Sequence, residues 1–154
     1  LQPEMIEDIF REAIHHLGRN KRKHNISMHL EDDLLMANMD ARLIIQVLVN
    51  LINNAIKYTH ENSNISLNAR RVEDKILIEV QDDGNGVLHP DQLFEMFYTE
   101  NNRGGDTRRG MGLGLSLCKS IIQSHGGTIW VENVTPHGAC FKFVLDAVEV
   151  KLYE

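Results

Sequence analysis

The sequence predicts an α+β domain in which a layer of helices covers a mainly antiparallel sheet. Several segments carry apolar residues at helical spacing, and pairs of short alternating segments joined by turn residues are typical of strands. A chain of 154 residues with 42% hydrophobic composition is long enough for one core of this kind. We therefore expect a single domain over residues 1–154.

The first half of the chain is expected to form two helices and one strand pair. Apolar residues at helical spacing predict a helix over residues 3–17. Alternating apolar residues predict strands over residues 26–30 and 34–39, which we expect to pair as a hairpin. Asp40 is a favourable N-cap for the longest predicted helix, over residues 41–58. We expect the buried stripe of that helix to consist of Leu43, Val47, Leu48, Leu51, Ile52 and Ala55.

The second half is expected to contain two further hairpins and two helices. Gly126 and Gly127 should end the longer of these helices. The stretch from Thr99 to Gly110 has no large apolar residue, so we expect a mobile loop there. The elements are expected over residues 65–72 with 75–81 (a hairpin), 90–97 (a short helix), 113–125 (a helix through Leu117, Ile121 and Ile122) and 128–134 with 139–145 (a hairpin).

Composition argues against several classes of protein. The formal net charge of −6 is unfavourable for sequence-independent binding to nucleic acid. The longest apolar runs are far shorter than the ~20 residues of a membrane span, and the first residues lack the pattern of a signal peptide. Cys118 and Cys140 lack CxxC spacing and lie in apolar stretches, so we expect buried thiols in a reducing compartment. The chain is thus expected to be cytoplasmic and not itself membrane-bound.

One face of the helix predicted over residues 41–58 carries three polar side chains. Asn50, Asn54 and Lys57 are spaced i, i+4 and i+7, which places them in one stripe. Amide oxygens can complete the coordination of Mg²⁺ already held by phosphates, and a lysine can meet a phosphate as a point charge. A solvated helix face explains the same pattern equally well, so the stripe alone leaves both interpretations open.

Two glycine-containing segments offer further binding groups. DDGNG (residues 82–86) follows a predicted strand, where glycines allow close approach of a ligand and Asp82 could accept from an exocyclic amine. A plain turn is the alternative. RGMGLGL (residues 109–115) opens a helix whose unpaired N–H groups favour a phosphate, without the spacing of a Rossmann fingerprint or a P-loop. Close helix packing is an alternative explanation for Gly114.

The order of these features resembles the ATP-binding catalytic domain of sensor histidine kinases, in the superfamily that includes gyrase B, Hsp90 and MutL. The resemblance covers almost the whole chain and implies a Bergerat-type two-layer α+β sandwich. In that fold a mixed, mainly antiparallel sheet is covered on one face by about three helices. The Kdp-type, potassium-sensing branch looks most similar. The segments that carry the resemblance are VLVNLINNAIKYT, DDGNG, LFEMFYT, RGMGLGL, SHGGTI and GACFKFVL.

The resemblance also implies roles for individual residues. Asn54 would ligate Mg²⁺, Asn50 would support the metal and the phosphates, and Lys57 would bind phosphate, which makes these three the expected catalytic residues. Tyr58 would line the nucleotide pocket and Asp82 would receive the adenine amine. The other expected ATP contacts are Gly84, Gly86, Arg109, Gly110, Gly112, Leu113 and Gly114, with residues 98–112 forming a mobile lid.

The implied activity is that of a protein histidine kinase catalytic domain. It would bind Mg-ATP and transfer the γ-phosphoryl group to a histidine on a separate dimerisation and phosphoacceptor domain, with a response regulator downstream. None of the eight histidines here fits the acceptor motif, so we expect the acceptor outside this chain and residues 1–20 to include a connecting helix. Asn50 stands where ATP-hydrolysing relatives carry Glu as a general base, which favours transfer over hydrolysis.

Two alternatives and several departures from the family pattern accompany this interpretation. The alternatives are a serine-kinase anti-sigma factor of the same superfamily and a degenerate interaction domain that has lost nucleotide. Thr99 replaces a frequent Arg, so Arg103, Arg108 or Arg109 would supply the positive charge of the lid. Asp83 replaces a frequent Asn, and Asp146 a usual Pro. Phe94 and Phe97 would be packing or docking residues.

Overall fold

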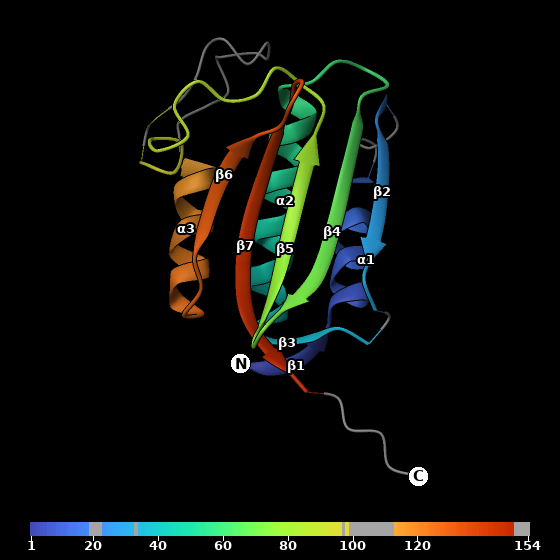
Figure 1. Cartoon of the computed structure of the whole chain (residues 1–154), viewed down its shortest axis with the longest axis vertical. Helices are drawn as coiled ribbons and strands as arrows, with labels where there is room; N and C mark the ends of the chain where they lie inside the picture. Colours follow the sequence, from blue (N-terminus) through green and yellow to red (C-terminus); the bar gives the residue numbers. More distant parts are fainter. Residues whose placement is uncertain (19–22, 33, 97, 99–112, 150–154) are drawn as a thin grey trace.

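The structure is a computed structural model and describes residues 1–18, 23–32, 34–96, 98 and 113–149. Within these residues, three helices lie behind one face of a seven-stranded sheet whose strand order is β1-β3-β7-β5-β4-β2, with β6 paired to β7 (Figure 1). The predicted two-layer α+β sandwich with a mixed, mainly antiparallel sheet is confirmed. The elements are β1 (Gln2–Met5), α1 (Ile6–His16), β2 (Asn25–Leu30), β3 (Met36–Met39), α2 (Ala41–Lys57), β4 (Asn64–Val72), β5 (Lys75–Asp82), α3 (Leu113–Ser124), β6 (Ile129–Asn133) and β7 (Ala139–Val148).

Two predictions for the N-terminal part were wrong. Residues 3–5 belong to a strand, because β1 pairs antiparallel with β3 at the end of the sheet, where Pro3 is tolerated. The two strands predicted as a hairpin do not pair with each other: β2 runs parallel to β4, whereas β3 pairs with β1 and β7. These partners are distant in sequence, and local alternation carries no information about them.

Helix α2 begins and ends almost as predicted. The carboxylate of Asp40 accepts from the backbone N–H of Leu43 at 3.3 Å, which satisfies one of the unpaired donors of the first turn. Leu43 itself is 36% exposed, so its place in the predicted buried stripe was wrong; Ile44 is buried there in its stead. The buried side of α2 consists of Ile44, Val47, Leu48, Leu51, Ile52 and Ala55.

In the second half, both hairpins predicted between strands are confirmed as β4–β5 and β6–β7. The short helix predicted over residues 90–97 is wrong: among its described residues the chain forms successive turns, with backbone bonds such as Glu95 N to Gln92 O at 3.0 Å. A segment this short gains little from helix formation, and here it is fixed by burying Leu93 and Phe94. Of the three apolar residues that predicted α3, Ile121 and Ile122 are buried, whereas Leu117 is 42% exposed.

Helix α1 packs on α2 and belongs to the same core. Ile6, Phe10 and Ala13 are fully buried, beneath the same sheet face that α2 covers. An additional role for residues 1–20 in connecting this domain to another stays a prediction. Among the described residues, no helix combines the length and apolar character needed to cross a bilayer.

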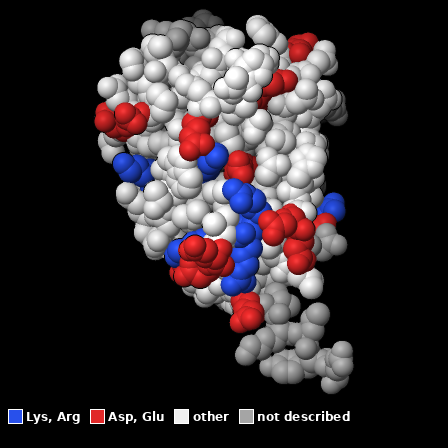
Figure 2. All heavy atoms as spheres, viewed as in Figure 1, with Lys and Arg blue, Asp and Glu red and all other residues white. Residues whose placement is uncertain are grey.

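The opposite face of the sheet carries charged side chains of both signs, as Figure 2 shows. Nζ of Lys142 lies 2.7 Å from a Glu132 carboxylate oxygen and 3.8 Å from one of Glu79, and Lys75 pairs with Asp146. This contrast between the two faces explains why the helices cover only one of them. Both cysteines are buried and unbridged, as predicted.

The arrangement brings distant segments together at one end of the sheet. The C-terminal end of α2, the start of β4, the end of β5 and the turn between β6 and β7 all lie at the top of the view in Figure 1. Polar and glycine residues concentrate in these segments. This end of the domain is therefore where a binding site is to be sought.

The corrected stripe of α2 can be tested by paired substitutions. Ile44→Ala is expected to lower the free energy of unfolding by about 2–5 kcal/mol, because it leaves a cavity in the core. Leu43→Ala should cost less than about 1 kcal/mol, since its side chain is partly exposed and alanine favours helix. Guanidinium unfolding followed by circular dichroism measures both; equal losses would contradict the burial assigned here.

Candidate functional site

The stripe predicted on α2 is present and is not a solvated face. Asn50, Asn54 and Lys57 all lie within α2 and are half-buried. Nδ2 of Asn50 donates to Sγ of Cys118 on α3 at 3.8 Å. Nδ2 of Asn54 is buried and has no hydrogen-bond partner among the described residues. A buried amide without a partner is costly, so Asn54 offers a donor that a ligand could satisfy.

The last turn of α2 holds a positive charge beside an aromatic ring. Nζ of Lys57 lies 5.0 Å from the ring centroid of Tyr58, within the range of a cation–π contact. Tyr58 is 8% exposed, and its backbone N–H bonds to the carbonyl of Asn54 at 3.2 Å. The helix terminus therefore places an ammonium group next to the amide stripe, where a phosphate could meet it.

Asp82 presents a buried carboxylate at the end of β5. It is 3% exposed, and its Oδ1 accepts from the backbone N–H of Gly84 at 2.9 Å and from that of Ala139 at 3.2 Å. These two bonds come from the following loop and from β7, so they fix the carboxylate from both sides. A carboxylate held in one orientation is suited to recognising a donor on a ligand.

Close approach explains the two glycines that follow Asp82. A Cβ on Gly84 would lie 2.9 Å from Cγ2 of Thr59 and 3.2 Å from the carbonyl oxygen of Tyr58, so the loop meets the end of α2 directly. Gly86 has φ +84°, and a Cβ there would lie 2.7 Å from Oδ1 of Asn133. A plain turn would not require either contact, so the structure favours a loop shaped against its neighbours.

Asn133 on β6 holds the same loop and carried no signal in the sequence. Its Oδ1 accepts from the N–H of Val87 at 2.7 Å, and its Nδ2 donates to the carbonyl of Val87 at 3.0 Å. The side-chain amide of Asn133 thus bonds both the N–H and the C=O of one residue, as the backbone of a neighbouring strand does in an antiparallel sheet. The glycine loop is thereby tied to the final hairpin.

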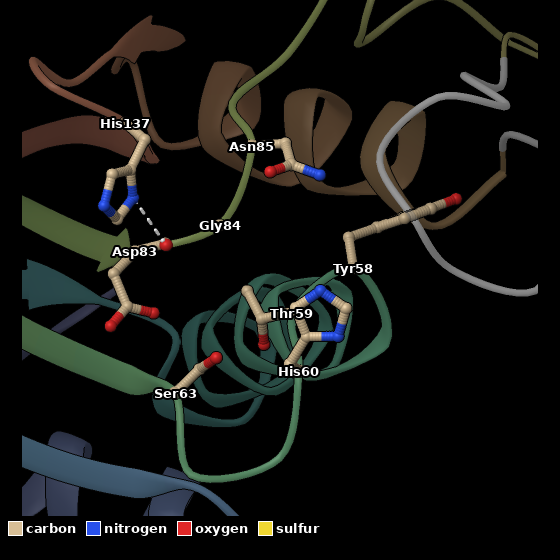
Figure 3. A pocket seen from close by; sticks show the side chains of 8 residues that line it. All are labelled: Tyr58, Thr59, His60, Ser63, Asp83, Gly84, Asn85 and His137. Atoms are coloured by element: carbon tan, nitrogen blue, oxygen red, sulfur yellow. Dashed lines mark hydrogen bonds between the residues drawn. The ribbon is translucent and has the colours of Figure 1, made fainter.

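A pocket of about 190 Å³ opens between the end of α2 and the loop after β5. Figure 3 shows Tyr58 and Asn85 on one side and His137, Asp83 and Ser63 on the other. Nδ1 of His137 donates to the carbonyl of Asp83 at 2.8 Å, which ties the β6–β7 turn to the pocket wall. The lining residues are Tyr58, Thr59, His60, Ser63, Asp83, Gly84, Asn85 and His137.

Of these lining residues, sequence reasoning predicted only Tyr58 and Gly84 as site residues. Thr59 and Asn85 lie inside the motifs KYT and DDGNG and could have been found from them. His60, Ser63 and His137 lie in turns that contain no recognisable motif. They reach the pocket only because the fold brings three turns together.

His24 is not among the residues that line the pocket, but it forms a hydrogen bond with Thr59, which is. Oγ1 of Thr59 donates to the carbonyl of Ala55 at 2.8 Å and so accepts from Nε2 of His24, 2.9 Å away. Burial lowers the pKa of His24, against the opposing effect of the carboxylates of Asp83 and Glu61. A neutral imidazole therefore locks the hydroxyl of Thr59, which keeps its methyl group against Gly84.

Several predicted site residues lie outside the described part of the chain. They are Arg109, Gly110 and Gly112, the side chain of Leu113, and the other lid residues Thr99, Arg103 and Arg108, together with Phe97. Gly114 lies in the first turn of α3 and is exposed; a Cβ there would meet none of the described residues within 4 Å. Close packing against the described part of the chain therefore does not explain Gly114. Phe94 packs edge-on against Phe141, with ring centroids 6.0 Å apart.

Comparison with known proteins gives a consistent result. Residues 39–149 match the family described as histidine kinase-, DNA gyrase B- and HSP90-like ATPase. The chain is 35% identical over 142 residues to the sensor protein KdpD of Clostridium acetobutylicum, covering 91% of this chain and 16% of that protein. It is 46% identical over 110 residues to the adaptive-response sensory kinase SasA of Crocosphaera subtropica, covering 69% and 28%. The chain thus spans less than a third of either relative.

Solved structures of one kinase are also similar. The catalytic domain of histidine kinase ThkA has a TM-score of 0.82 and 29% identity, covering 94% of this chain and 96% of that domain. ThkA in complex with the response regulator TrrA has a TM-score of 0.74 and 28% identity, covering 96% and 42%. The similarity to KdpD agrees with the branch that the sequence most resembled.

The close approach at Gly84 can be tested against an open glycine. Gly84→Ala is expected to lower the free energy of unfolding by about 1–3 kcal/mol, because the methyl of Thr59 is held by two hydrogen bonds of its hydroxyl and cannot give way easily. Gly114→Ala should leave stability unchanged or raise it by up to about 1 kcal/mol, since space is open and alanine favours helix. Thermal unfolding of both variants decides; a Gly84→Ala protein as stable as the wild type would contradict the contact.

Proposed function

Because the chain belongs to the histidine kinase-, DNA gyrase B- and HSP90-like ATPase family and is the catalytic domain of a sensor histidine kinase, we propose that its parent protein transfers the γ-phosphoryl group of ATP to a histidine side chain. The domain binds ATP, as its family does. We also propose which residues bind the nucleotide. The observation that carries it is the half-buried stripe on α2, with its unpaired amide at Asn54.

The adenine end of the nucleotide is assigned to the loop after β5. Asp82 would accept a hydrogen bond from the exocyclic amine, since its carboxylate is buried and held by Gly84 and Ala139. Gly84 and Gly86 let the loop after β5 lie directly against Thr59 and Asn133, and this loop would form one wall of the purine site. Tyr58 lines the pocket beside Gly84 and would contact the base through its ring.

The phosphate end is assigned to the α2 stripe and a Mg²⁺ ion. The residues fit such a group: the unpaired Nδ2 of Asn54 can donate to a phosphate oxygen while its Oδ1 ligates the metal. Asn50 supports the metal and phosphates one turn earlier, and Lys57 meets a phosphate from the helix end. When bound, Mg²⁺ neutralises phosphate charge as it develops during transfer.

The remaining phosphate contacts are proposed at the start of α3. Backbone N–H groups around Gly112, Leu113 and Gly114 would approach the phosphates, with Gly110 and Arg109 completing a lid. Gly114 is exposed, and a Cβ there would meet none of the described residues within 4 Å, which suits a backbone kept accessible to a ligand. Arg109, Gly110 and Gly112 lie outside the described residues. The backbone of Leu113 is described, but its side chain is not.

The choice between transfer and hydrolysis depends on Asn50. An amide cannot take a proton from water, so this helix lacks the general base that a glutamate would supply at the same place. The imidazole nitrogen of the acceptor histidine would form a bond to the γ-phosphorus while the bond to the β-phosphate oxygen breaks and ADP leaves. The chain's own groups then act by holding and orienting the phosphates.

The proposed partners follow from the same assignment. A helical dimerisation and phosphoacceptor domain of the parent protein would present the histidine, and a response regulator would receive the phosphate next. The complex of ThkA with the response regulator TrrA supports a partner of that class. We place this domain in the cytoplasm, where ATP is available. The resemblance offered an anti-sigma kinase as an alternative, and no observation on this structure favours it.

Substitutions at the two ends of the nucleotide test the site. Asn54→Ala and Asp82→Asn are each expected to weaken binding of an ATP analogue with Mg²⁺ at least about tenfold, because each removes a contact to a charged or buried polar group. The amide oxygen of Asp82→Asn can still accept from Gly84 and Ala139, so the fold should persist. Gln46→Ala on the exposed side of α2 is the matched control. Calorimetric titration showing unchanged affinity in both site variants would refute the assignment.

The class of acceptor is tested with radiolabelled ATP. The isolated chain should bind ATP and incorporate almost no phosphate, whereas the full-length parent protein should become labelled. The label is expected to be labile in acid and stable in alkali, as for phosphohistidine. Acid-stable label on a serine of a partner protein would overturn transfer to histidine and support the anti-sigma alternative.

A further inference from the structure

Cys118 lies where α3 packs on α2, directly against the stripe that carries Asn50. Its side chain is 0% exposed. Its sulfur lies within hydrogen-bond distance of a backbone carbonyl oxygen, a contact that a protonated thiol makes as an S–H donor. A thiol in this state can donate one hydrogen bond and accept others weakly.

The two contacts of Cys118 with α2 use both of these capacities. Its S–H donates to the carbonyl oxygen of Val47 at 3.8 Å, one turn before Asn50. Its sulfur also lies 3.8 Å from Nδ2 of Asn50, which donates to it. Both are weak hydrogen bonds that involve sulfur, yet together they determine which group donates in the contact between Cys118 and Asn50. Because the only thiol proton points at Val47, the sulfur presents lone pairs to the amide of Asn50.

A lone pair attracts the amide NH₂ group and repels the amide oxygen. The flipped amide would set Oδ1 of Asn50 against the sulfur, and the S–H would then have to leave the carbonyl oxygen of Val47 to place a proton between them. The contact therefore selects the orientation in which Oδ1 is turned away from Cys118. Fixing that orientation before a ligand binds removes an ordering cost from the binding step.

We infer that Cys118 is a positioning residue for Asn50, which holds its Nδ2 against α3 and so presents its Oδ1 to the Mg²⁺ and phosphates of the bound nucleotide. The inference rests on the proposed function, because it assigns this contact to the nucleotide site. It also gives an otherwise inert, buried thiol a purpose. Cys118 itself touches neither metal nor nucleotide in this account.

The test measures how much Mg²⁺ tightens nucleotide binding. We call this the Mg²⁺ benefit, the ratio of the dissociation constant without Mg²⁺ to that with Mg²⁺. The dissociation constant of AMPPNP, a non-hydrolysable ATP analogue, is measured by calorimetry with MgCl₂ and again with EDTA. Cys118→Ala removes the sulfur acceptor and should reduce the Mg²⁺ benefit about threefold to tenfold, the size expected for one lost hydrogen bond. Cys118→Ser keeps a donor and an acceptor and should restore most of it. If Cys118→Ala does not fold, Cys118→Val takes its place, with the same expected loss.

A second readout reports on the amide directly. The side-chain NH₂ resonances of Asn50 in ¹H–¹⁵N spectra of the nucleotide-free protein should move in Cys118→Ala and return towards wild type in Cys118→Ser. Cys140→Ala is the matched control, because that thiol is also buried but contacts Glu79 on the other side of the sheet. It should change neither the Mg²⁺ benefit nor the Asn50 resonances.

The outcomes separate this inference from the proposed function. A wild-type chain that binds AMPPNP no better with Mg²⁺ than with EDTA would refute the metal site itself. Wild-type binding that depends on Mg²⁺, with the same dependence and unmoved Asn50 resonances in Cys118→Ala, would overturn only the positioning role. Loss in Cys118→Ala that serine does not restore would also count against it, since cavity formation alone would then account for the change.

Discussion

The site depends on the packing of backbone around the buried carboxylate of Asp82. Two backbone N–H groups, from Gly84 and Ala139, share its Oδ1, so the end of β5, the following loop and the start of β7 are fixed together. This requires glycine at positions where any Cβ would collide: Gly138 has φ +124° and presses on the carbonyl of Asp82, and Gly84 presses on Thr59. The residues that follow the last turn of α2, Tyr58 and Thr59, pack directly against this closed end of the sheet at Gly84.

Much of the fold was predictable because its elements are set by local pattern. The apolar stripe and the N-cap of α2, and the hairpins β4–β5 and β6–β7, follow from residues close in sequence. The partners of β1, β2 and β3 were missed because they lie tens of residues away, and the exposure of Leu43 depends on the angle at which α2 meets the sheet. At the site, Tyr58 and Gly84 were predicted from their motifs, and Thr59 and Asn85 could have been found in the same motifs. Asn133, His24 and His137 act through contacts that only the folded chain creates.

The polar stripe of α2 offers groups that could bind phosphates but no group that could act as a general base. Asn54 carries an unpaired amide, and Asn50 carries an amide already engaged by the thiol of Cys118. Neither can serve as a general base, so in the proposed site the stripe would hold phosphates without activating water. A domain built in this way would leave the attacking group to another part of the parent protein, as the proposed function requires.

The most direct test of the account is a crystal structure of this chain with AMPPNP and Mg²⁺. We expect Oδ1 of Asn54 at about 2.1 Å from the metal, as Mg²⁺ coordination requires, and a carboxylate oxygen of Asp82 within hydrogen-bond distance of the adenine amine. A nucleotide bound with its metal away from α2, or with the adenine away from Asp82, would contradict the site proposed here.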